Sequence, residues 1–271
     1  MRKFKEVQDD FLKKAEVAGI DKSDIDFIFC NVMGINRSKL ASVSEISDYE
    51  EMQARRILKK RIKGIPLDQI FGYTNFYGLD FYINREVLIP RPETELLCEE
   101  IMKILREGLK GLDIGTGSGS IAITLSKLKN MDMLASDISA KALRVARKNN
   151  KLLGASVKFI KSDLFKKIDG KFDFIVSNPP YIKTADIDNL QTEVRDHEPH
   201  LALDGKEDGL YFYREIIKSA PKYLKKGGMI FFELGALQSE MVRNMLEENF
   251  TDIKIKKDYN RIDRIIYAIK K

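Results

Sequence analysis

Hydrophobic residues follow a helical period at the start of this chain and a strand-like pattern later in it. Phe4, Val7 and Phe11 recur at helical spacing, which predicts an amphipathic helix that stops near Gly19. A second helix is predicted from about residue 23 to residue 32. The chain therefore begins with helices that each need a partner to cover an apolar face.

A third helix has an explicit start signal. Ser47 and Glu50 have the spacing of a capping box, in which each side chain satisfies a backbone N–H of the first turn. Gly64 suits the position just after the last turn. Residues 1–65 are predicted to form a small helical bundle, interpreted as a substrate-docking domain because no residue in it has an obvious chemical role. A purely structural cap is the alternative.

Residues 66–90 link this bundle to the rest of the chain. The stretch 73–83 is rich in Tyr and Phe and predicts a β-hairpin with its turn near Gly78. The following Ile-Pro-Arg-Pro-Glu-Thr-Glu segment leads into a helix predicted from residue 96 to about 105, with prolines that stiffen the entry.

From Lys110 onward, short apolar runs alternate with helical patterns, which is typical of a parallel α/β sheet covered by helices. Residues 91–271 are therefore predicted to form one α/β domain. Strands are predicted at residues 111–114, 133–136, 157–161, 172–177, 229–233, 253–257 and 264–269. Helices are predicted at residues 120–128, 141–153, 209–224 and 239–248.

The strand at 172–177 ends in the rigid sequence Asn178-Pro179-Pro180-Tyr181. Proline cannot donate to a sheet ladder, so the strand stops there, and Asn178 is biased to extended geometry by the proline after it. The Asn178 side-chain oxygen and the Pro179 carbonyl can each accept one hydrogen from a planar NH2 group, and Tyr181 can stack on its plane. A plain strand end is the alternative, because short motifs also occur by chance.

Glycines at alternate positions follow the first predicted strand of the sheet, in the loop Gly115-Thr116-Gly117-Ser118-Gly119. Glycine allows a sharp turn and a close approach of a ligand to the backbone. The spacing is neither that of a dinucleotide-binding loop nor that of a P-loop. The loop therefore favours a nucleoside with a small polar tail over a pyrophosphate.

Acidic residues end the next two strands. Asp137 follows the second strand, where a carboxylate can accept both hydroxyls of a ribose. Asp163 and Leu164 end the third strand, where the edge and face of an adenine would lie. A helix N-cap is the alternative for Asp137, and a turn is the alternative for Asp163. Because the carboxyl ends of parallel strands meet at one edge of a sheet, these sites together predict a nucleoside-type cofactor.

Composition narrows the class of protein. The chain is 44% hydrophobic and 32% charged, an ordinary globular balance, and it contains no apolar run long enough for a membrane span. Cys30 and Cys98 lie far apart, which indicates reduced thiols in a cytoplasmic protein. The net charge of +6 is compatible with a nucleic-acid partner, but the lysines are spread along the chain.

Both histidines lie in the sequence His197-Glu198-Pro199-His200. The spacing is wrong for a helical pair of metal ligands and Pro199 breaks a helix there, so we expect no metal site. The surrounding segment, residues 184–205, is long for a connection and is interpreted as a functional lid.

With these motifs the chain resembles the HemK/PrmC family of protein-glutamine methyltransferases, which modify peptide chain release factors. The Asn-Pro-Pro-Tyr motif is shared with DNA and RNA amino methyltransferases, so the Ile-Pro-Arg-Pro-Glu-Thr-Glu segment is the more specific signal. The resemblance covers essentially the whole chain beyond Pro66. It is carried by residues 89–95, 113–119, 177–182, 198–199, 202–203, 208–210 and 262–264.

The resemblance implies a Rossmann-like class I methyltransferase fold with a seven-stranded sheet, beside the N-terminal bundle and the hairpin linker. It implies S-adenosylmethionine as methyl donor, held by residues 115–119, Asp137, Leu164 and Asn178. It further implies that the acceptor is the glutamine of the Gly-Gly-Gln loop of class 1 release factors, bound by residues 178–181. The catalytic residues would be Asn178, Pro179 and Tyr181.

An adenine-type nucleic-acid amino methyltransferase is the alternative function, with a flipped base stacked on Tyr181. The sequence contains no basic segment interleaved with aromatic residues, so direct nucleic-acid binding is not expected. We expect a monomeric cytoplasmic enzyme that has a release factor as its partner and does not bind membranes.

Overall fold

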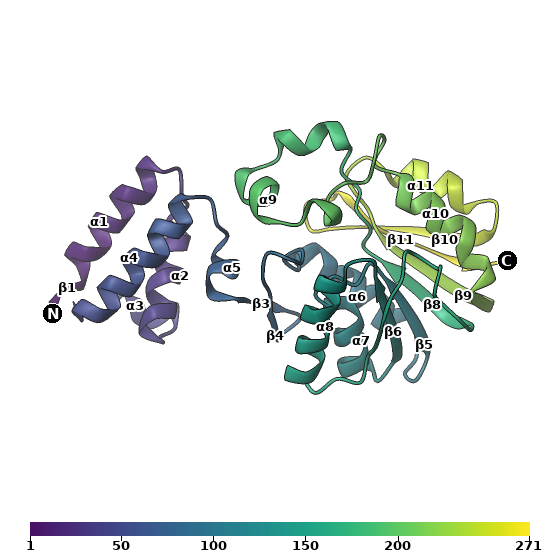
Figure 1. The fold of residues 1–271 in the computed structure, drawn as a ribbon, viewed down its shortest axis with the longest axis horizontal. Coiled ribbons are helices and arrows are strands. Elements are labelled where there is room, and N and C mark those ends of the chain that lie inside the picture. The colour runs from purple at the N-terminus through teal and green to yellow at the C-terminus, as the bar shows by residue number, and fades with distance from the viewer. The chain divides into compact units, whose positions relative to one another are not determined.

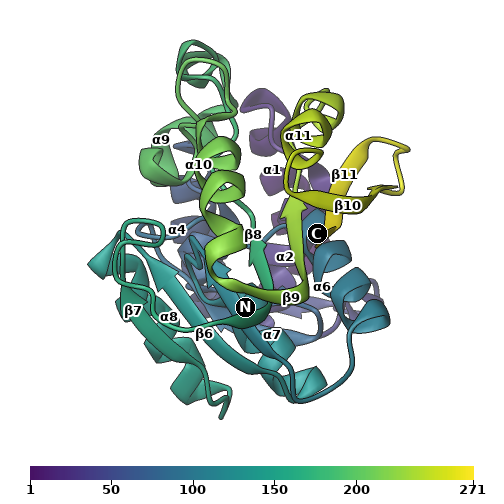
Figure 2. The ribbon, with the colours of Figure 1, turned by 90° about the vertical axis from the view of Figure 1, so that its right-hand side faces the viewer.

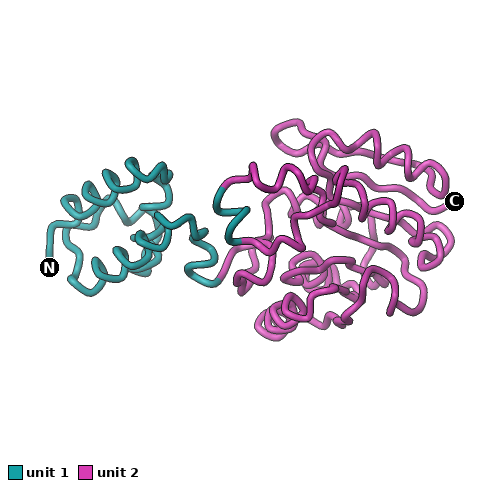
Figure 3. Tube along the Cα trace, turned by 45° about the horizontal axis from the view of Figure 1, so that its top comes forward, with its two compact units in different colours: residues 1–72, 192–197 teal, residues 73–191, 198–271 magenta.

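The structure, a computed structural model, describes all 271 residues and divides into two compact units (Figure 3). Unit 1 comprises residues 1–72 and 192–197, and unit 2 comprises residues 73–191 and 198–271. A short part of the long segment that follows Asn-Pro-Pro-Tyr therefore belongs to the helical unit. No helix in either unit combines the length and apolar character that a membrane crossing requires.

Unit 1 is a helical bundle around an apolar core (Figure 1). Its aromatic centre is formed by Phe29, whose ring centroid lies 5.0 Å from that of Phe4 and 4.8 Å from that of Phe11. The main helices are α1 (Phe4–Val17), α2 (Lys22–Met33) and α4 (Asp48–Ile62). The smaller elements are β1 (Arg2–Lys3), α3 (Arg37–Leu40), β2 (Glu45–Ile46), α5 (Leu67–Phe71) and α9 (Thr192–His197).

The capping box predicted at the start of α4 is confirmed. The Glu50 backbone N–H donates to the Ser47 hydroxyl at 3.2 Å, and the Ser47 backbone N–H donates to the Glu50 carboxylate at 2.9 Å. At the other end, Gly64 has a φ of 82°, the left-handed conformation expected after a helix. Local sequence therefore determines both ends of this helix.

Helix α9 is held within unit 1 by polar contacts. The Arg61 guanidinium donates to the Asp24 carboxylate at 2.6 Å and to the Glu193 carboxylate at 2.5 Å. The Gln69 side chain donates to the His197 carbonyl at 2.7 Å. These contacts join a segment of the long loop to helices more than a hundred positions earlier in the chain.

The predicted hairpin begins unit 2. Strands β3 (Tyr73–Phe76) and β4 (Leu79–Tyr82) pair antiparallel through the two-residue turn Tyr77-Gly78. Both turn residues have positive φ, 52° and 75°, as a type I′ hairpin turn requires. The prediction of a turn near Gly78 is confirmed.

Unit 2 contains the predicted seven-stranded sheet, in the order β10-β11-β9-β8-β5-β6-β7. All neighbouring strands pair parallel except for β11, which is antiparallel to both β9 and β10. The strands are β5 (Lys110–Ile114), β6 (Asp132–Asp137), β7 (Lys158–Lys161), β8 (Phe172–Ser177), β9 (Leu224–Glu233), β10 (Phe250–Lys257) and β11 (Asp263–Lys270).

Helices cover both faces of this sheet (Figures 1 and 2). Each face carries its own buried apolar cluster, as expected for a sheet whose central strands are buried on both sides. One face is covered by α6 (Pro92–Ile104), α7 (Ser120–Lys129) and α8 (Ala140–Leu152). The other is covered by α10 (Tyr211–Ser219) and α11 (Ser239–Leu246).

The chain direction reverses at the centre of the sheet. From β5 the chain winds outward through β6 to β7, and it then returns to β8 on the other side of β5. The loops after β5 and β8 leave in opposite directions, which opens a crevice at the carboxyl ends of these two strands.

Two predicted helices are corrected by the structure. Helix α10 ends at Ser219 and gives way to a 3-10 turn at Ala220–Lys222, not to a helix that continues to residue 224. The reason is Pro221, which lacks the N–H that a longer α-helix needs. Helix α6 begins at Pro92, four residues before the predicted start, because proline is well suited to the first turn of a helix.

Candidate functional site

A cavity of about 370 Å³ lies at the carboxyl ends of the central strands of unit 2. Its volume falls within the range of small-molecule sites. Segments that follow β5, β6, β7 and β8 meet there, as the topology requires. Of the residues predicted from sequence, the cavity is lined by Gly115, Gly117, Asp137, Asp163, Leu164, Asn178, Pro179 and Pro180.

The glycine loop presents backbone to this cavity. Gly115 and Gly117 have φ angles of 76° and 55°, and a Cβ on either would project into open space. The neighbouring Thr116, Ser118 and Gly119 do not line the cavity. A Cβ on Gly119 would lie 2.8 Å from the Ile123 side chain, so its role is to let the loop pack against α7.

A buried carboxylate that sequence reasoning missed braces this loop from inside. Asp113, on β5, is fully buried and accepts a hydrogen bond from the Thr116 hydroxyl at 2.6 Å. Burial raises the pKa of Asp113 to about 7. The signal in the sequence was an acidic residue within an apolar strand directly before the glycines. Thr116 therefore stabilises the loop by its hydrogen bond to Asp113, and it does not line the cavity.

Asp137 ties the end of β6 to the same loop. Its carboxylate accepts hydrogen bonds from the Gly117 N–H at 2.9 Å and from the Ser139 N–H at 2.8 Å. Burial raises the pKa of Asp137, although hydrogen bonds from the backbone N–H groups of Ser139, Gly117 and Ile138 lower it. Ser139 is the N-cap of α8, since its hydroxyl accepts from the Ala142 N–H at 3.1 Å. Asp137 is therefore free of that capping role and lines the cavity.

The residues after β7 form the next part of the wall. Leu164 has a φ of 47°, which is uncommon for leucine, and the turn is held by the Ser162 hydroxyl, which donates to the Leu164 carbonyl at 2.8 Å. Asp163 forms an ion pair with Lys166 at 2.7 Å. Leu164 thus supplies an apolar surface beside a half-exposed carboxylate.

Asn178 stands at the end of β8, where its backbone is anchored by neighbours. The Ser177 hydroxyl donates to the Ile114 carbonyl at 2.7 Å, which ties the ends of β8 and β5 together. The Asn178 side-chain NH2 donates to the Thr94 hydroxyl at 3.2 Å, while its side-chain oxygen has no donor within the protein. A free carbonyl acceptor therefore stands in the wall of the cavity.

Behind Asn178 lies a second buried carboxylate that sequence reasoning missed. The Thr94 hydroxyl donates to Glu233 at 2.6 Å, and burial raises the pKa of Glu233 to about 7. Thr94 is on α6 and Glu233 ends β9. The sequence places Glu233 at the end of an apolar strand, but only the fold brings it to Thr94.

Residues 203–205 pack against the chain just after the Asn-Pro-Pro-Tyr segment. The Ile182 N–H donates to the Leu203 carbonyl at 3.1 Å, and the Gly205 N–H donates to the Ile182 carbonyl at 2.7 Å. A Cβ on Gly205 would lie 2.8 Å from the Tyr181 Cα, so only glycine fits this approach. The rigid platform is thus clamped at the strand end and after it.

Tyr181 is placed differently from its predicted neighbours. It does not line the cavity but packs against the apolar cluster beneath α10 and α11, and its carbonyl accepts from Gln238 at 3.0 Å. Burial raises the pKa of Tyr181 to about 12, so its phenol stays neutral. Stacking of Tyr181 on a substrate remains a prediction.

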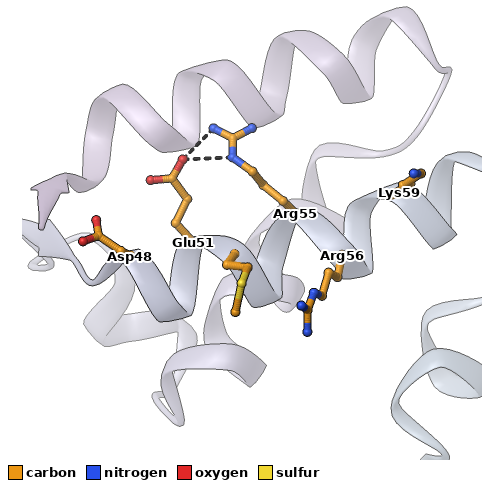
Figure 4. A pocket seen from close by; sticks show the side chains of 6 residues that line it. Asp48, Glu51, Arg55, Arg56 and Lys59 are labelled. Atoms are coloured by element: carbon orange, nitrogen blue, oxygen red, sulfur yellow. Dashed lines mark hydrogen bonds and ion pairs between the residues drawn. The ribbon is translucent and has the colours of Figure 1, made fainter.

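Unit 1 has its own, more open hollow of about 410 Å³ along α4 (Figure 4). Arg55 donates to the Glu51 carboxylate at 2.6 and 2.9 Å, and Figure 4 shows this pair on one side of the helix and the Arg56 side chain pointing to the other. The hollow exposes mixed charges on one helix and lacks the converging strand ends of the site in unit 2.

Two family models match the chain. The PrmC N-terminal domain matches residues 9–72, and the methyltransferase small domain matches residues 92–206. A release factor glutamine methyltransferase of Bacillus cereus is 39% identical over 263 residues, which cover 92% of this chain and 93% of that protein. A protein of the same name from Fusobacterium nucleatum is 41% identical over 258 residues, which cover 91% of this chain and 73% of that protein.

The fold also occurs among solved structures. A methyltransferase from Pyrococcus furiosus superimposes with a TM-score of 0.58 at 20% identity, covering 78% of this chain and 98% of that chain. At this identity the likeness concerns the fold, and it agrees with the class I methyltransferase sheet that the sequence predicts.

Proposed function

Because the chain belongs to the family of release factor glutamine methyltransferases, we propose that it methylates a glutamine side chain of a release factor with S-adenosylmethionine as donor. The acceptor is the glutamine of the Gly-Gly-Gln motif of class 1 release factors. The observation that carries this proposal is the free side-chain oxygen of Asn178 in the cavity wall at the end of β8.

The residues of the cavity fit S-adenosylmethionine. Backbone of Gly115 and Gly117 lies open to a ligand, because neither residue carries a Cβ that would fill the space. The Asp137 carboxylate accepts the ribose hydroxyls, and each of its oxygens keeps a lone pair beyond the backbone bond it already accepts. Asp163 accepts a hydrogen bond from the edge of the adenine, and Leu164 packs on its face.

Bound S-adenosylmethionine supplies an electrophilic methyl group on a positively charged sulfur. A carboxamide nitrogen is a weak nucleophile, because its lone pair is delocalised into the carbonyl. The Asn178 oxygen and the Pro179 carbonyl each accept one N–H of the substrate amide, which increases electron density on the nitrogen and aims it at the methyl group. With the cofactor bound, the amide nitrogen would form a bond to the methyl carbon as the bond from that carbon to sulfur breaks and its electron pair stays on sulfur. The methylated nitrogen would then release a proton to water.

Unit 1 docks the release factor, and unit 2 alone binds the cofactor. The match of residues 9–72 to the PrmC N-terminal domain supports this division, and the cavity in unit 2 uses no residue of unit 1. The basic residues Arg56 and Lys59 in the hollow of Figure 4 are available to an acidic surface of the partner. We place the enzyme in the cytoplasm as a monomer.

One experiment tests the proposal directly. The purified protein is incubated with isotope-labelled S-adenosylmethionine and a purified class 1 release factor, and the Gly-Gly-Gln peptide is analysed by mass spectrometry. A release factor with Gly-Gly-Ala in place of Gly-Gly-Gln is the matched control. Label on the glutamine alone is expected. Label on added duplex DNA or RNA, with none on the release factor, would instead establish the nucleic-acid alternative.

A further inference from the structure

The Ile-Pro-Arg-Pro-Glu-Thr-Glu segment places one hydroxyl directly behind the free acceptor of the site. We propose that Thr94 and Glu233 are positioning residues that set the orientation of the Asn178 amide, so that its oxygen and not its NH2 faces the substrate. This inference rests on the proposed function, because it assigns Asn178 the role of acceptor for a substrate NH2.

The orientation follows from counting donors and acceptors along the chain of hydrogen bonds. An ionised Glu233 can only accept, so the Thr94 hydroxyl donates its single hydrogen to it, at 2.6 Å. Because its hydrogen is used in this way, the Thr94 hydroxyl oxygen can only accept from Asn178. The Asn178 NH2 donates to it at 3.2 Å. The oxygen of Asn178 is consequently on the side of the cavity.

This control matters because the two ends of an asparagine amide have almost the same shape. A rotation of 180° about the last side-chain bond would present NH2 to the substrate NH2, and two donors cannot form a hydrogen bond. Packing alone does not separate the two orientations. A charged acceptor behind the amide does separate them, because the Glu233 carboxylate can only accept. It accepts from the Thr94 hydroxyl and also interacts with the Asn178 side chain directly.

The first turn of α6 is itself firmly placed, which keeps Thr94 in position. Pro92 begins the helix, and Arg91, just before it, donates to the buried Glu198 carboxylate at 2.5 Å. The Glu95 carboxylate accepts from the Tyr77 N–H at 2.6 Å. The proline and the charged residues of the segment therefore fix the position of the first turn of α6. Thr94 is the residue of this turn that contacts Asn178.

Protonation of Glu233 removes the constraint that fixes the direction of this chain of hydrogen bonds. Burial raises the pKa of Glu233 to about 7, and the charge of Glu93 adds to this rise, while hydrogen bonds from Thr94 and Asn178 and the charge of Arg264 lower it. A neutral carboxyl can either accept from Thr94 or donate to it. In the second arrangement Thr94 donates to the Asn178 oxygen, which then faces away from the substrate. The other titratable groups around Glu233 are Glu93 and Cys98 on α6, Tyr181 after β8 and Tyr213 on α10.

Three threonine variants separate positioning from packing. Thr94→Val removes the hydroxyl at nearly constant shape, Thr94→Ser retains it, and Thr124→Val removes a buried hydroxyl on α7 that has no hydrogen-bond partner. Thr94→Val is expected to lower the single-turnover rate on release factor at least about tenfold, with unchanged affinity for S-adenosylmethionine. Thr94→Ser should retain most of the rate, and Thr124→Val all of it. Equal rates for Thr94→Val and Thr124→Val would overturn the inference.

A second readout does not depend on turnover. The side-chain NH2 signals of Asn178 in the 15N–1H spectrum, assigned by their loss in Asn178→Asp, should shift with a midpoint near pH 7. In Glu233→Gln this titration should disappear, and in Thr94→Val its amplitude should decrease, because Asn178 then senses Glu233 only through their direct contact. Signals that stay constant from pH 5.5 to 8.5 would contradict the assigned role. If the Asn178 signals titrate as expected but the release factor is not methylated, the proposed function is wrong and the role of Thr94 and Glu233 in orienting Asn178 stands.

Discussion

The carboxylate of Asp137 accepts a hydrogen bond from the Gly117 N–H at 2.9 Å, across the gap between the ends of two parallel strands. One carboxylate thus shapes the glycine loop and remains in the cavity wall. Any change at Asp137 therefore acts on two parts of the cofactor site together.

Asp137→Ala is expected to weaken the binding of S-adenosylmethionine by about 1–3 kcal/mol, because hydrogen bonds to a charged acceptor are lost. Isothermal titration calorimetry measures the affinity. Asp169→Ala is the matched control, since Asp169 is exposed and does not line the cavity. Unchanged affinity in Asp137→Ala would remove this carboxylate from the cofactor site.

Asn178→Ala should reduce the rate of methyl transfer about a hundredfold or more, because one oriented acceptor is lost at the reacting nitrogen. Asn178→Asp keeps an acceptor but adds negative charge near the positive cofactor. It should bind S-adenosylmethionine at least as well as the wild type and still react more slowly, because the positive charge is dispersed in the transition state. Single-turnover rates and cofactor affinities for both variants are the measurements. Near-normal rates in both variants would show that Asn178 has only a structural role at the strand end.

A chain that lacks residues 1–72 tests the division of labour. It should bind S-adenosylmethionine with normal affinity, because the cavity and both apolar clusters of the sheet lie in unit 2. Methylation of intact release factor should fall by orders of magnitude. Circular dichroism and thermal unfolding confirm that the shortened chain is folded. A normal rate on intact release factor would contradict the docking role.

Arg61→Ala should loosen helix α9 from unit 1, because Arg61 is its ionic link to Glu193 and also pairs with Asp24. Hydrogen exchange of residues 192–197 is expected to rise about tenfold, equivalent to about 1.4 kcal/mol of local stability. Arg56→Ala is the control, since Arg56 is an exposed residue of the same helix. The same exchange rates in both variants would show that Arg61 does not hold α9.

Glu233 also makes stability depend on pH. Its pKa of about 7 exceeds the ordinary 4.5, so the folded protein binds more protons than the unfolded chain between these values. The free energy of unfolding therefore falls as pH rises from about 4.5 to about 7. The wild type should lose up to about 3 kcal/mol more unfolding free energy than Glu233→Gln between pH 5 and pH 8. Urea unfolding at the two pH values measures this difference.

The exposed Glu240→Gln is the matched control for this series, and it should follow the wild type at both pH values. The buried Asp113, whose pKa is also about 7, contributes the same sign of slope to every variant and so cancels in the comparison. Parallel curves for the wild type and Glu233→Gln would mean that Glu233 titrates alike in the folded and unfolded chains.

The sequence by itself determined the features that depend on a few neighbouring residues. The capping box of Ser47 and Glu50, the turn at Gly78 and the end of β8 before Pro179 all follow from local backbone chemistry. The meeting of Gly117, Asp137 and Asn178 was also predictable, because parallel strands place their carboxyl ends at one edge.

Tertiary structure alone decided which distant side chains became partners. Thr94 and Glu233 are 139 positions apart, and Arg61 and Glu193 are 132 apart, so no sequence pattern links them. The raised pKa values of Glu233 and Asp113 likewise arise from burial, which depends on how helices cover the sheet. Local sequence determines where elements begin and end, whereas strand order and packing determine what each polar group meets, because those contacts form only when the whole sheet has assembled.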